Sequence, residues 1–152
     1  MATDRQSSES GTGGMFRRVL VGYDGSTDAV RALRAALGLA ADLRGEALVL
    51  LVVRLPAHFE TPEDRLNAAE SERENLVRGL SVVQGQAVLR SDVSTVVIYA
   101  DDPARAIADY AEEHGFDLVV VGGHGREQIT HRGLGRSVEA LLRHHPCPVL
   151  VV

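Results

Sequence analysis

The stretch Val-Leu-Val-Gly-Tyr-Asp-Gly-Ser at residues 19–26 begins the pattern that decides the fold. Its apolar, β-branched start predicts a short buried strand, and the glycines that follow predict a tight loop at the end of that strand. The stretch Val-Val-Val-Gly-Gly-His-Gly at residues 119–125 has the same form. Each apolar run enters a G-x-x-G loop, and glycine lets a ligand approach the backbone closely. If the two strands are neighbours, both loops meet at one crevice. Loops of this kind are also often rich in glycine for turning alone.

Strand and helix signals alternate through the rest of the chain. Apolar runs predict strands, and helical spacing of apolar residues predicts helices. The further strands are expected at 47–53, 93–99, 118–121 and 148–152, and the helices at 29–43, 61–80, 102–114 and 136–144. The extent of the second helix beyond Leu80 stays open, because Gly79 and Gly85 weaken the helical pattern there.

This alternation predicts the fold class and the domain organisation. Strands that alternate with helices give an α/β domain, here a single doubly wound, five-stranded parallel sheet with helices on both faces. The domain is expected at residues 16–152, and the polar, Ser- and Gly-rich segment 1–15 is expected to be a disordered tail. Such sheets bind ligands beyond the carboxyl ends of their strands, at the point where the strand order reverses.

Composition excludes several kinds of chemistry. All 16 basic residues of this 152-residue chain are arginine, so a Walker-A phosphate loop, a Schiff-base enzyme and a protein kinase are excluded, because each needs a lysine. The formal net charge of −5 argues against a nucleic-acid partner.

Location is predicted from three further features. Cys147 is the single cysteine, which excludes an internal disulfide and suits a reducing compartment. The N-terminus lacks the apolar stretch of a secretory signal, and no apolar run approaches the length of about 20 residues that a membrane span requires. We therefore expect a cytoplasmic protein without a membrane segment.

The loop after the fourth strand carries the strongest functional signal. It runs from Gly122 to Leu134, whereas such loops usually have about 2–6 residues. It contains several glycines and arginines and ends at a predicted helix start, where free backbone N–H groups and the helix dipole favour an anion. These features predict a phosphate cradle that needs no lysine; the alternative is a mobile loop with solvated arginines.

Three sequence motifs together resemble those of the universal stress protein family. They are Val-Gly-Tyr-Asp-Gly-Ser at 21–26, Asp-Leu-Val-Val-Val-Gly-Gly-His-Gly-Arg at 117–126, and Arg-His-His-Pro-Cys-Pro-Val-Leu-Val-Val at 143–152. Gly122, Gly125 and Gly135 also match the G-x2-G-x9-G spacing of the ATP-binding branch of that family. The resemblance covers nearly all of residues 16–152.

The resemblance implies a nucleotide site, with ATP or a related adenine nucleotide as ligand, either alone or together with magnesium. It places Asp24 at the ribose or adenine, Val53 in the adenine pocket, and the glycines around the ribose and phosphates. The start of the last helix would hold the phosphates. The residues implied in binding are Gly22, Tyr23, Asp24, Val53, Val121, Gly122, Gly123, Gly125, Arg126, Gly135, Arg136, Ser137 and Val138.

The chain departs from the family pattern at residue 136. Arg136 follows Gly135 where the ATP-binding pattern has a hydroxyl, and Ser137 comes one residue later. Such a shift at a helix start turns a side chain by about 100°. Arg136 either adds positive charge to a phosphate or blocks it, and Ser137 either caps the helix or faces elsewhere.

Other patterns carry little chemistry. The spacing of the six histidines matches no zinc pattern, and no G-x-S-x-G elbow or acid–base set is visible, so no metal site and no catalytic residues are expected. The apolar C-terminal run 148–152 predicts an edge strand, and the resemblance implies a homodimer through it. The sequence thus predicts a nucleotide-responsive regulatory or stress-tolerance protein. A family member that acts through protein contacts alone and a slow nucleotide hydrolase are the alternatives.

Overall fold

The computed structural model describes residues 15–55, 57–86, 93–126 and 133–152. Strands and helices alternate along the chain, as predicted. Their bounds are β1 (Arg18–Tyr23), α1 (Thr27–Asp42), β2 (Glu46–Arg54), α2 (Pro62–Gln86), β3 (Ser94–Ala100), α3 (Pro103–Glu113), β4 (Leu118–Val121), α4 (Arg136–His144) and β5 (Val149–Val151). Apart from Met15, the tail expected at residues 1–15 lies outside the described residues.

The strands form one parallel sheet in the order β3-β2-β1-β4-β5. β1 and β4 are therefore neighbours, with Leu20 beside Val119 and Val21 beside Val120. The chain builds the sheet outward from β1 to β3, returns to the other side of β1 for β4, and continues outward to β5. The strand order consequently reverses between β1 and β4, and the doubly wound α/β fold is confirmed.

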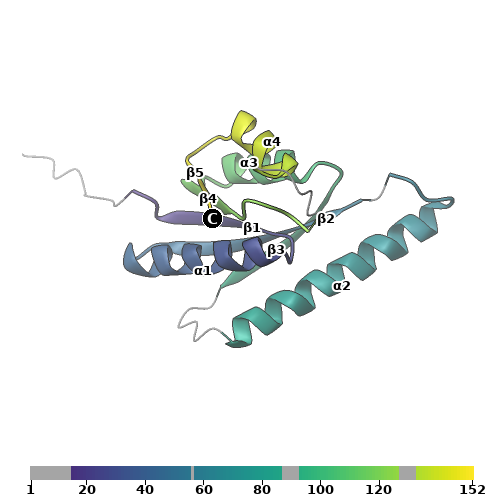
Figure 1. The fold of residues 1–152 in the computed structure, drawn as a ribbon, viewed down its shortest axis with the longest axis horizontal. Coiled ribbons are helices and arrows are strands. Elements are labelled where there is room, and N and C mark those ends of the chain that lie inside the picture. The colour runs from purple at the N-terminus through teal and green to yellow at the C-terminus, as the bar shows by residue number, and fades with distance from the viewer. Residues whose placement is uncertain (1–14, 56, 87–92, 127–132) are drawn as a thin grey trace, which may run out of the picture.

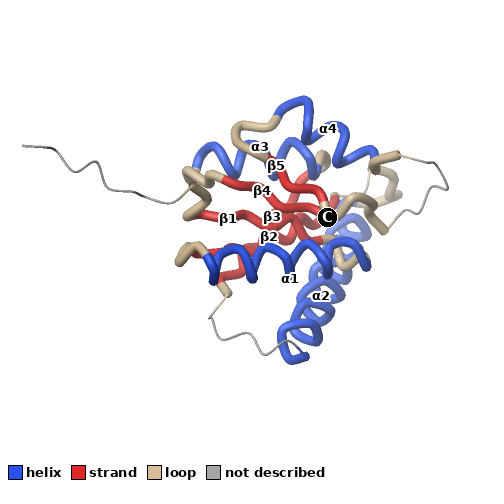
Figure 2. The backbone as a smooth tube through the Cα atoms, turned by 60° about the vertical axis from the view of Figure 1, so that its left-hand side comes forward, coloured by secondary structure: helices blue, strands red, loops and turns tan. Residues whose placement is uncertain are grey.

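The helices form a layer on each side of the sheet. In Figure 1, α1 and α2 lie below the sheet, and α3 and α4 lie above it; the turned view of Figure 2 shows the same two layers. Successive side chains of a strand point to opposite faces. Val19 and Val21 accordingly pack in the core on the α1/α2 side, whereas Leu20 packs in the core on the α3/α4 side.

The helix starts follow from capping side chains. The hydroxyl of Ser26 accepts a hydrogen bond from the N–H of Ala29 at 3.1 Å, and Asp102 accepts one from the N–H of Arg105 at 3.2 Å. The sequence left open how far the second helix extends beyond Leu80, and in the structure α2 continues to Gln86. No helix in the described part of the chain is long and apolar enough to cross a membrane.

Candidate functional site

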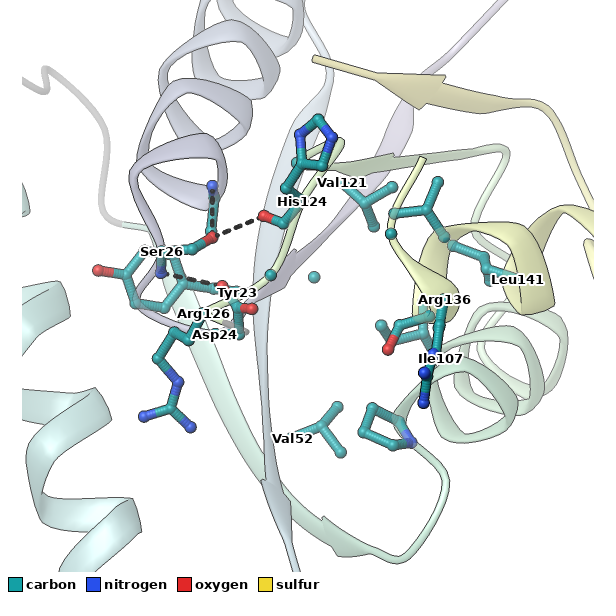
Figure 3. A pocket seen from close by; sticks show the side chains of 18 of the residues that line it. Tyr23, Asp24, Ser26, Val52, Ile107, Val121, His124, Arg126, Arg136 and Leu141 are labelled. Atoms are coloured by element: carbon teal, nitrogen blue, oxygen red, sulfur yellow. Dashed lines mark hydrogen bonds between the residues drawn. The ribbon is translucent and has the colours of Figure 1, made fainter. Parts of the chain in front are cut away.

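A cavity of about 620 Å³ lies at the carboxyl ends of β1 and β4, where the strand order reverses. This is the position at which doubly wound sheets bind their ligands. The volume falls within the range of about 300–1,000 Å³ that is typical of small-molecule sites. Figure 3 shows Tyr23, Asp24, Ser26 and Arg126 on one side of the cavity and Arg136 on the other.

One part of the cavity wall is apolar. Five aliphatic side chains contribute to it: Val52, Ile107, Val121, Val138 and Leu141. Gly22 lies close to two of these side chains. A Cβ on Gly22 would come within 2.9 Å of Cδ1 of Ile107 and 3.1 Å of Cγ1 of Val121. The missing side chain lets α3 approach the end of β1. The result is a surface suited to a flat apolar ring.

Val52 rather than Val53 contributes its side chain to this wall. The sequence assigned the adenine pocket to Val53, but its side chain is fully buried in the core on the α1/α2 side. The cavity opens on the α3/α4 side, and neighbouring side chains of a strand face opposite ways. The correction therefore follows from the parity of β2, and Val52 is the residue that lines the cavity.

Glycines bring the two strand-end loops into direct contact. A Cβ on Gly122 would lie 2.5 Å from the backbone carbon of Asp28, so the end of β4 packs against the first turn of α1. A Cβ on Gly125 would lie 2.9 Å from Oδ2 of Asp24. The sequence predicted that the two loops meet if their strands are neighbours, and β1 and β4 are neighbours. Gly123 is not among the residues that line the cavity, and its N–H donates to the carbonyl of Val152 at 3.0 Å.

The start of α4 forms the opposite wall. Gly135 is the residue at the helix N-cap, and no side chain caps the helix there. The N–H of Gly135 donates to the carbonyl of Gly123 at 2.8 Å, which fixes the helix start beside the loop. Arg136, Ser137 and Val138 all line the cavity. The backbone N–H groups of this first turn are consequently available to an anion.

Charged side chains of both signs surround the cavity. The Arg126 guanidinium forms an ion pair with Glu72 of α2, and Arg54 and Arg136 also line the cavity. Oδ1 of Asp24 accepts a hydrogen bond from the N–H of Ser26 at 2.9 Å. Burial, and secondarily the Asp24 carboxylate, raises the pKa of Tyr23 and keeps its hydroxyl protonated. The cavity therefore combines an acidic side near Asp24 with arginines that can meet an anion.

The structure brings eleven of the thirteen expected residues to one cavity; Val53 and Gly123 are the exceptions. Sequence reasoning missed several lining residues. Strand parity could have found Val52, whereas Glu72 and Ile107 come from helices whose packing no local pattern reveals. Among the described residues, no group of three or more His, Cys, Asp or Glu side chains could hold a metal ion.

The architecture defines the class: a doubly wound α/β protein with a ligand-sized cavity at its switch point. The family model of the universal stress protein family matches residues 15–152, and the chain belongs to that family. Universal stress protein YxiE of Bacillus subtilis is 30% identical, over 91% of this chain and 99% of its own length. A solved member of the family from Burkholderia pseudomallei is 32% identical, with a TM-score of 0.71, over 92% of this chain and 98% of its own.

Two further solved structures of the same fold hold adenine nucleotides. One is a universal stress protein in complex with cAMP, with a TM-score of 0.66 and 22% identity over 91% of this chain and 98% of its own. The other is from Archaeoglobus fulgidus in complex with dAMP, with a TM-score of 0.62 and 20% identity over 91% of this chain and 98% of its own. At these identities the likeness to this chain is one of fold.

Proposed function

We propose that this protein binds ATP or a related adenine nucleotide in the cavity between β1 and β4, and acts in the cytoplasm as a nucleotide-responsive regulatory or stress-tolerance protein. The observation that carries the proposal is the division of the cavity into two parts. An apolar wall with Val52 and Ile107 suits an adenine ring, and the glycine-bounded start of α4 suits phosphates. The nucleotide complexes of the same fold support the choice of an adenine ligand.

The absence of lysine dictates how phosphates would be held. Backbone N–H groups at the start of α4, the helix dipole and arginine supply the positive potential. Arg136 is the first residue of α4 and lines the cavity. A cation at a helix N-terminus is electrostatically unfavourable on its own. A phosphate bound at the helix start would attract the Arg136 guanidinium and offset this unfavourable interaction. We therefore assign Arg136 the role of a phosphate ligand and not that of a side chain that blocks the phosphates. A magnesium ion would enter with the triphosphate.

Two glycine variants test the proposal. Gly125→Val and Gly135→Val place branched side chains beside Asp24 and Gly123, at the contacts where the loops meet. Isothermal titration calorimetry with ATP and magnesium should show binding to the wild type and a loss of at least about tenfold in each variant, equivalent to about 1.4 kcal/mol. Gly38→Ala is the matched control, because a Cβ there meets nothing within 4 Å.

The same experiment separates the alternatives. A wild-type protein that binds no adenine nucleotide at millimolar concentration would replace the proposal with a family member that acts through protein contacts. Mass spectrometry of whatever co-purifies with the native protein gives an independent answer. Release of phosphate over many turnovers, abolished by the same glycine variants, would instead indicate a nucleotide hydrolase.

We also propose that the protein forms a homodimer through β5. This strand lies at one edge of the sheet. The carbonyl of Pro148 and the N–H of Val152 bond to β4 at 3.0 Å each, so the alternate residues Val149 and Val151 direct their backbone groups to the outer edge. An exposed edge of this kind can pair with a second copy.

The dimer is best tested at Val151. Deletion of residues 150–152 should abolish dimers, but it also removes the carbonyl of Val152 that holds Gly123. Val151→Pro removes one outward N–H and leaves the N–H of Val152 in place. Analytical ultracentrifugation should give twice the monomer mass for the wild type and the monomer mass for Val151→Pro. A folded Val151→Pro variant that stays dimeric would exclude this interface.

A further inference from the structure

His124 lies at the junction of three segments that build the cavity. It follows Gly123 in the loop after β4, and its own N–H donates to Oδ2 of Asp28 at 3.1 Å. Its carbonyl accepts a hydrogen bond from the hydroxyl of Ser26 at 3.2 Å. The backbone of His124 is therefore fixed against the first turn of α1. Figure 3 shows this hydrogen bond between the Ser26 hydroxyl and the carbonyl of His124 as a dashed line.

The imidazole ring adds two further contacts, and both partners accept hydrogen bonds. Nδ1 lies 3.0 Å from Oδ2 of Asp28, and Nε2 lies 2.7 Å from the carbonyl oxygen of Gly133. A neutral imidazole has one N–H and one lone pair, so it can satisfy one of these oxygens and must turn a lone pair toward the other. The imidazolium form donates to both. The geometry therefore matches the protonated ring.

The carbonyl of Gly133 connects this ring to the phosphate end of the cavity. Gly133 and Gly135 both line the cavity, and Gly135 is the N-cap of α4. The ring thus spans from Asp28 on α1 to the residues that lead into α4. A change in either contact alters how firmly the start of α4 is held relative to the loop after β4.

The charges around the ring favour the imidazolium. Asp28 faces it from α1, and Arg31 on the same helix pairs with Oδ1 of Asp28 at 2.5 Å. The hydrogen bond to Asp28, followed by that to the Gly133 carbonyl, raises the pKa of His124 above its usual value, although desolvation and Arg31 act in the opposite direction. The same pair holds the pKa of Asp28 below its usual range. The two carboxylate oxygens of Asp28 are thus shared between Arg31 and His124.

We propose that His124 is a positioning residue: as an imidazolium it ties the start of α4 to the first turn of α1, so that nucleotide affinity falls as His124 loses its proton. This inference rests on the proposed nucleotide site. The effect has a defined direction, since a group whose pKa is raised in the folded protein contributes fully below its usual value near pH 6.5 and loses that contribution as pH rises through the raised value.

Two variants separate the two ring contacts. His124→Asn keeps a donor near Nδ1 for Asp28, and His124→Gln keeps a donor near Nε2 for Gly133. Affinities for ATP with magnesium are measured for both variants and the wild type from pH 6.0 to 8.5. His124→Asn should bind about three- to tenfold more weakly than the wild type at pH 6.0, the equivalent of one lost hydrogen bond, and nearly equally at pH 8.5. Because the comparison is made at each pH, protonation of the nucleotide affects every protein alike.

His114 provides the matched control. Its Nδ1 contacts the Tyr110 carbonyl at 2.9 Å, at the end of α3 away from the cavity lining. His114→Asn should keep the wild-type affinity at every pH. A constant ratio between His124→Asn and the wild type across the pH range would show a merely structural role and would overturn the proposal.

A titration of the ligand-free protein keeps this proposal distinct from the proposed function. NMR of the histidine ring should place the pKa of His124 above the ordinary value, and Asp28→Asn should lower it. If the wild type binds no nucleotide, the proposed function fails on its own account. A His124 pKa at or below the ordinary value, or one that Asp28→Asn leaves unchanged, would overturn the positioning role by itself.

Discussion

The two ends of the parallel sheet differ in how β1 and β4 are joined to the segments around them. At the amino ends of β1 and β4, side chains fill and bind the junction. The carboxylate of Asp117 accepts from the N–H groups of Arg17 and Arg18 at 2.8 and 2.9 Å, and the Arg18 guanidinium lies 4.8 Å from the centre of the Phe116 ring. At the carboxyl ends, glycines replace side chains, and the junction encloses a cavity.

This difference indicates that the contacts at the amino end serve stability, whereas those at the carboxyl end serve the proposed ligand binding. The ion pair between Arg18 and Glu46 at 2.6 Å and the hydrogen bonds to Asp117 link the segments that enter β1, β2 and β4 at the amino end. At the carboxyl end, Gly122 and Gly135 allow close backbone packing, since a Cβ would lie 2.5 Å from the backbone carbon of Asp28 at Gly122 and 3.3 Å from the carbonyl oxygen of Gly123 at Gly135. Substitutions at the amino end should therefore change stability alone, whereas substitutions at the carboxyl end should change ligand binding, with or without stability.

The largest effect is expected from Gly122→Ala. The added Cβ would lie 2.5 Å from the backbone carbon of Asp28 and 2.7 Å from the nitrogen of Ala29, so the first turn of α1 must move. Overpacking against backbone should lower the free energy of unfolding by about 3 kcal/mol. Urea denaturation measures that loss, and calorimetry should show that ATP binding is lost with it. The control Gly38→Ala should be slightly stabilising, because it replaces an open helical glycine.

The next effect contrasts two neighbouring residues of β2. Val53→Ala removes methyl groups from the closed core and should cost about 2 kcal/mol of unfolding free energy with little change in affinity. Val52→Ala alters the cavity wall and should weaken ATP binding more than it affects stability. Denaturation and calorimetry on both variants test the assignment. A larger loss of affinity in Val53→Ala would reverse the parity argument.

These two valines also show which features of the fold and the site can be predicted from the sequence. The strands and the helices follow from local patterns, because apolar periodicity and glycine report directly on burial and turning. The adjacency of the two G-x-x-G loops depends instead on the strand order, which places β1 beside β4. Whether Val52 or Val53 faces the cavity depends on which helices cover which face, and that is set by the crossover from β3 to β4. Glu72 and Ile107 reach the site through tertiary packing, which no nearby motif encodes.

A smaller effect is expected at the amino end from Asp117→Asn. The variant keeps one acceptor oxygen and turns an NH2 group toward one of the two backbone N–H donors of Arg17 and Arg18. Loss of that bond should lower the free energy of unfolding by about 1–2 kcal/mol. ATP affinity measured below the unfolding transition should equal that of the wild type. A reduced affinity would mean that the two ends of the sheet are coupled through β1 and β4.

The smallest effect is expected from Arg136→Ser, which places after Gly135 the hydroxyl of the ATP-binding pattern that the sequence resembles. Arg136 is exposed and lies in the first turn of α4, away from the packed core, so stability should change by less than about 0.5 kcal/mol. If the guanidinium meets a phosphate, ATP affinity should fall about fivefold, or about 1 kcal/mol, and the loss should shrink as salt is raised.

The salt dependence distinguishes the two roles that the sequence left open for Arg136. A phosphate ligand contributes electrostatically, so wild type and Arg136→Ser should converge at high ionic strength. A side chain that blocks the phosphates acts by volume, which salt does not screen. Tighter ATP binding in Arg136→Ser at every salt concentration would therefore identify Arg136 as an obstacle. The phosphates would then depend on the backbone N–H groups at the start of α4 and on Ser137, which lines the same wall.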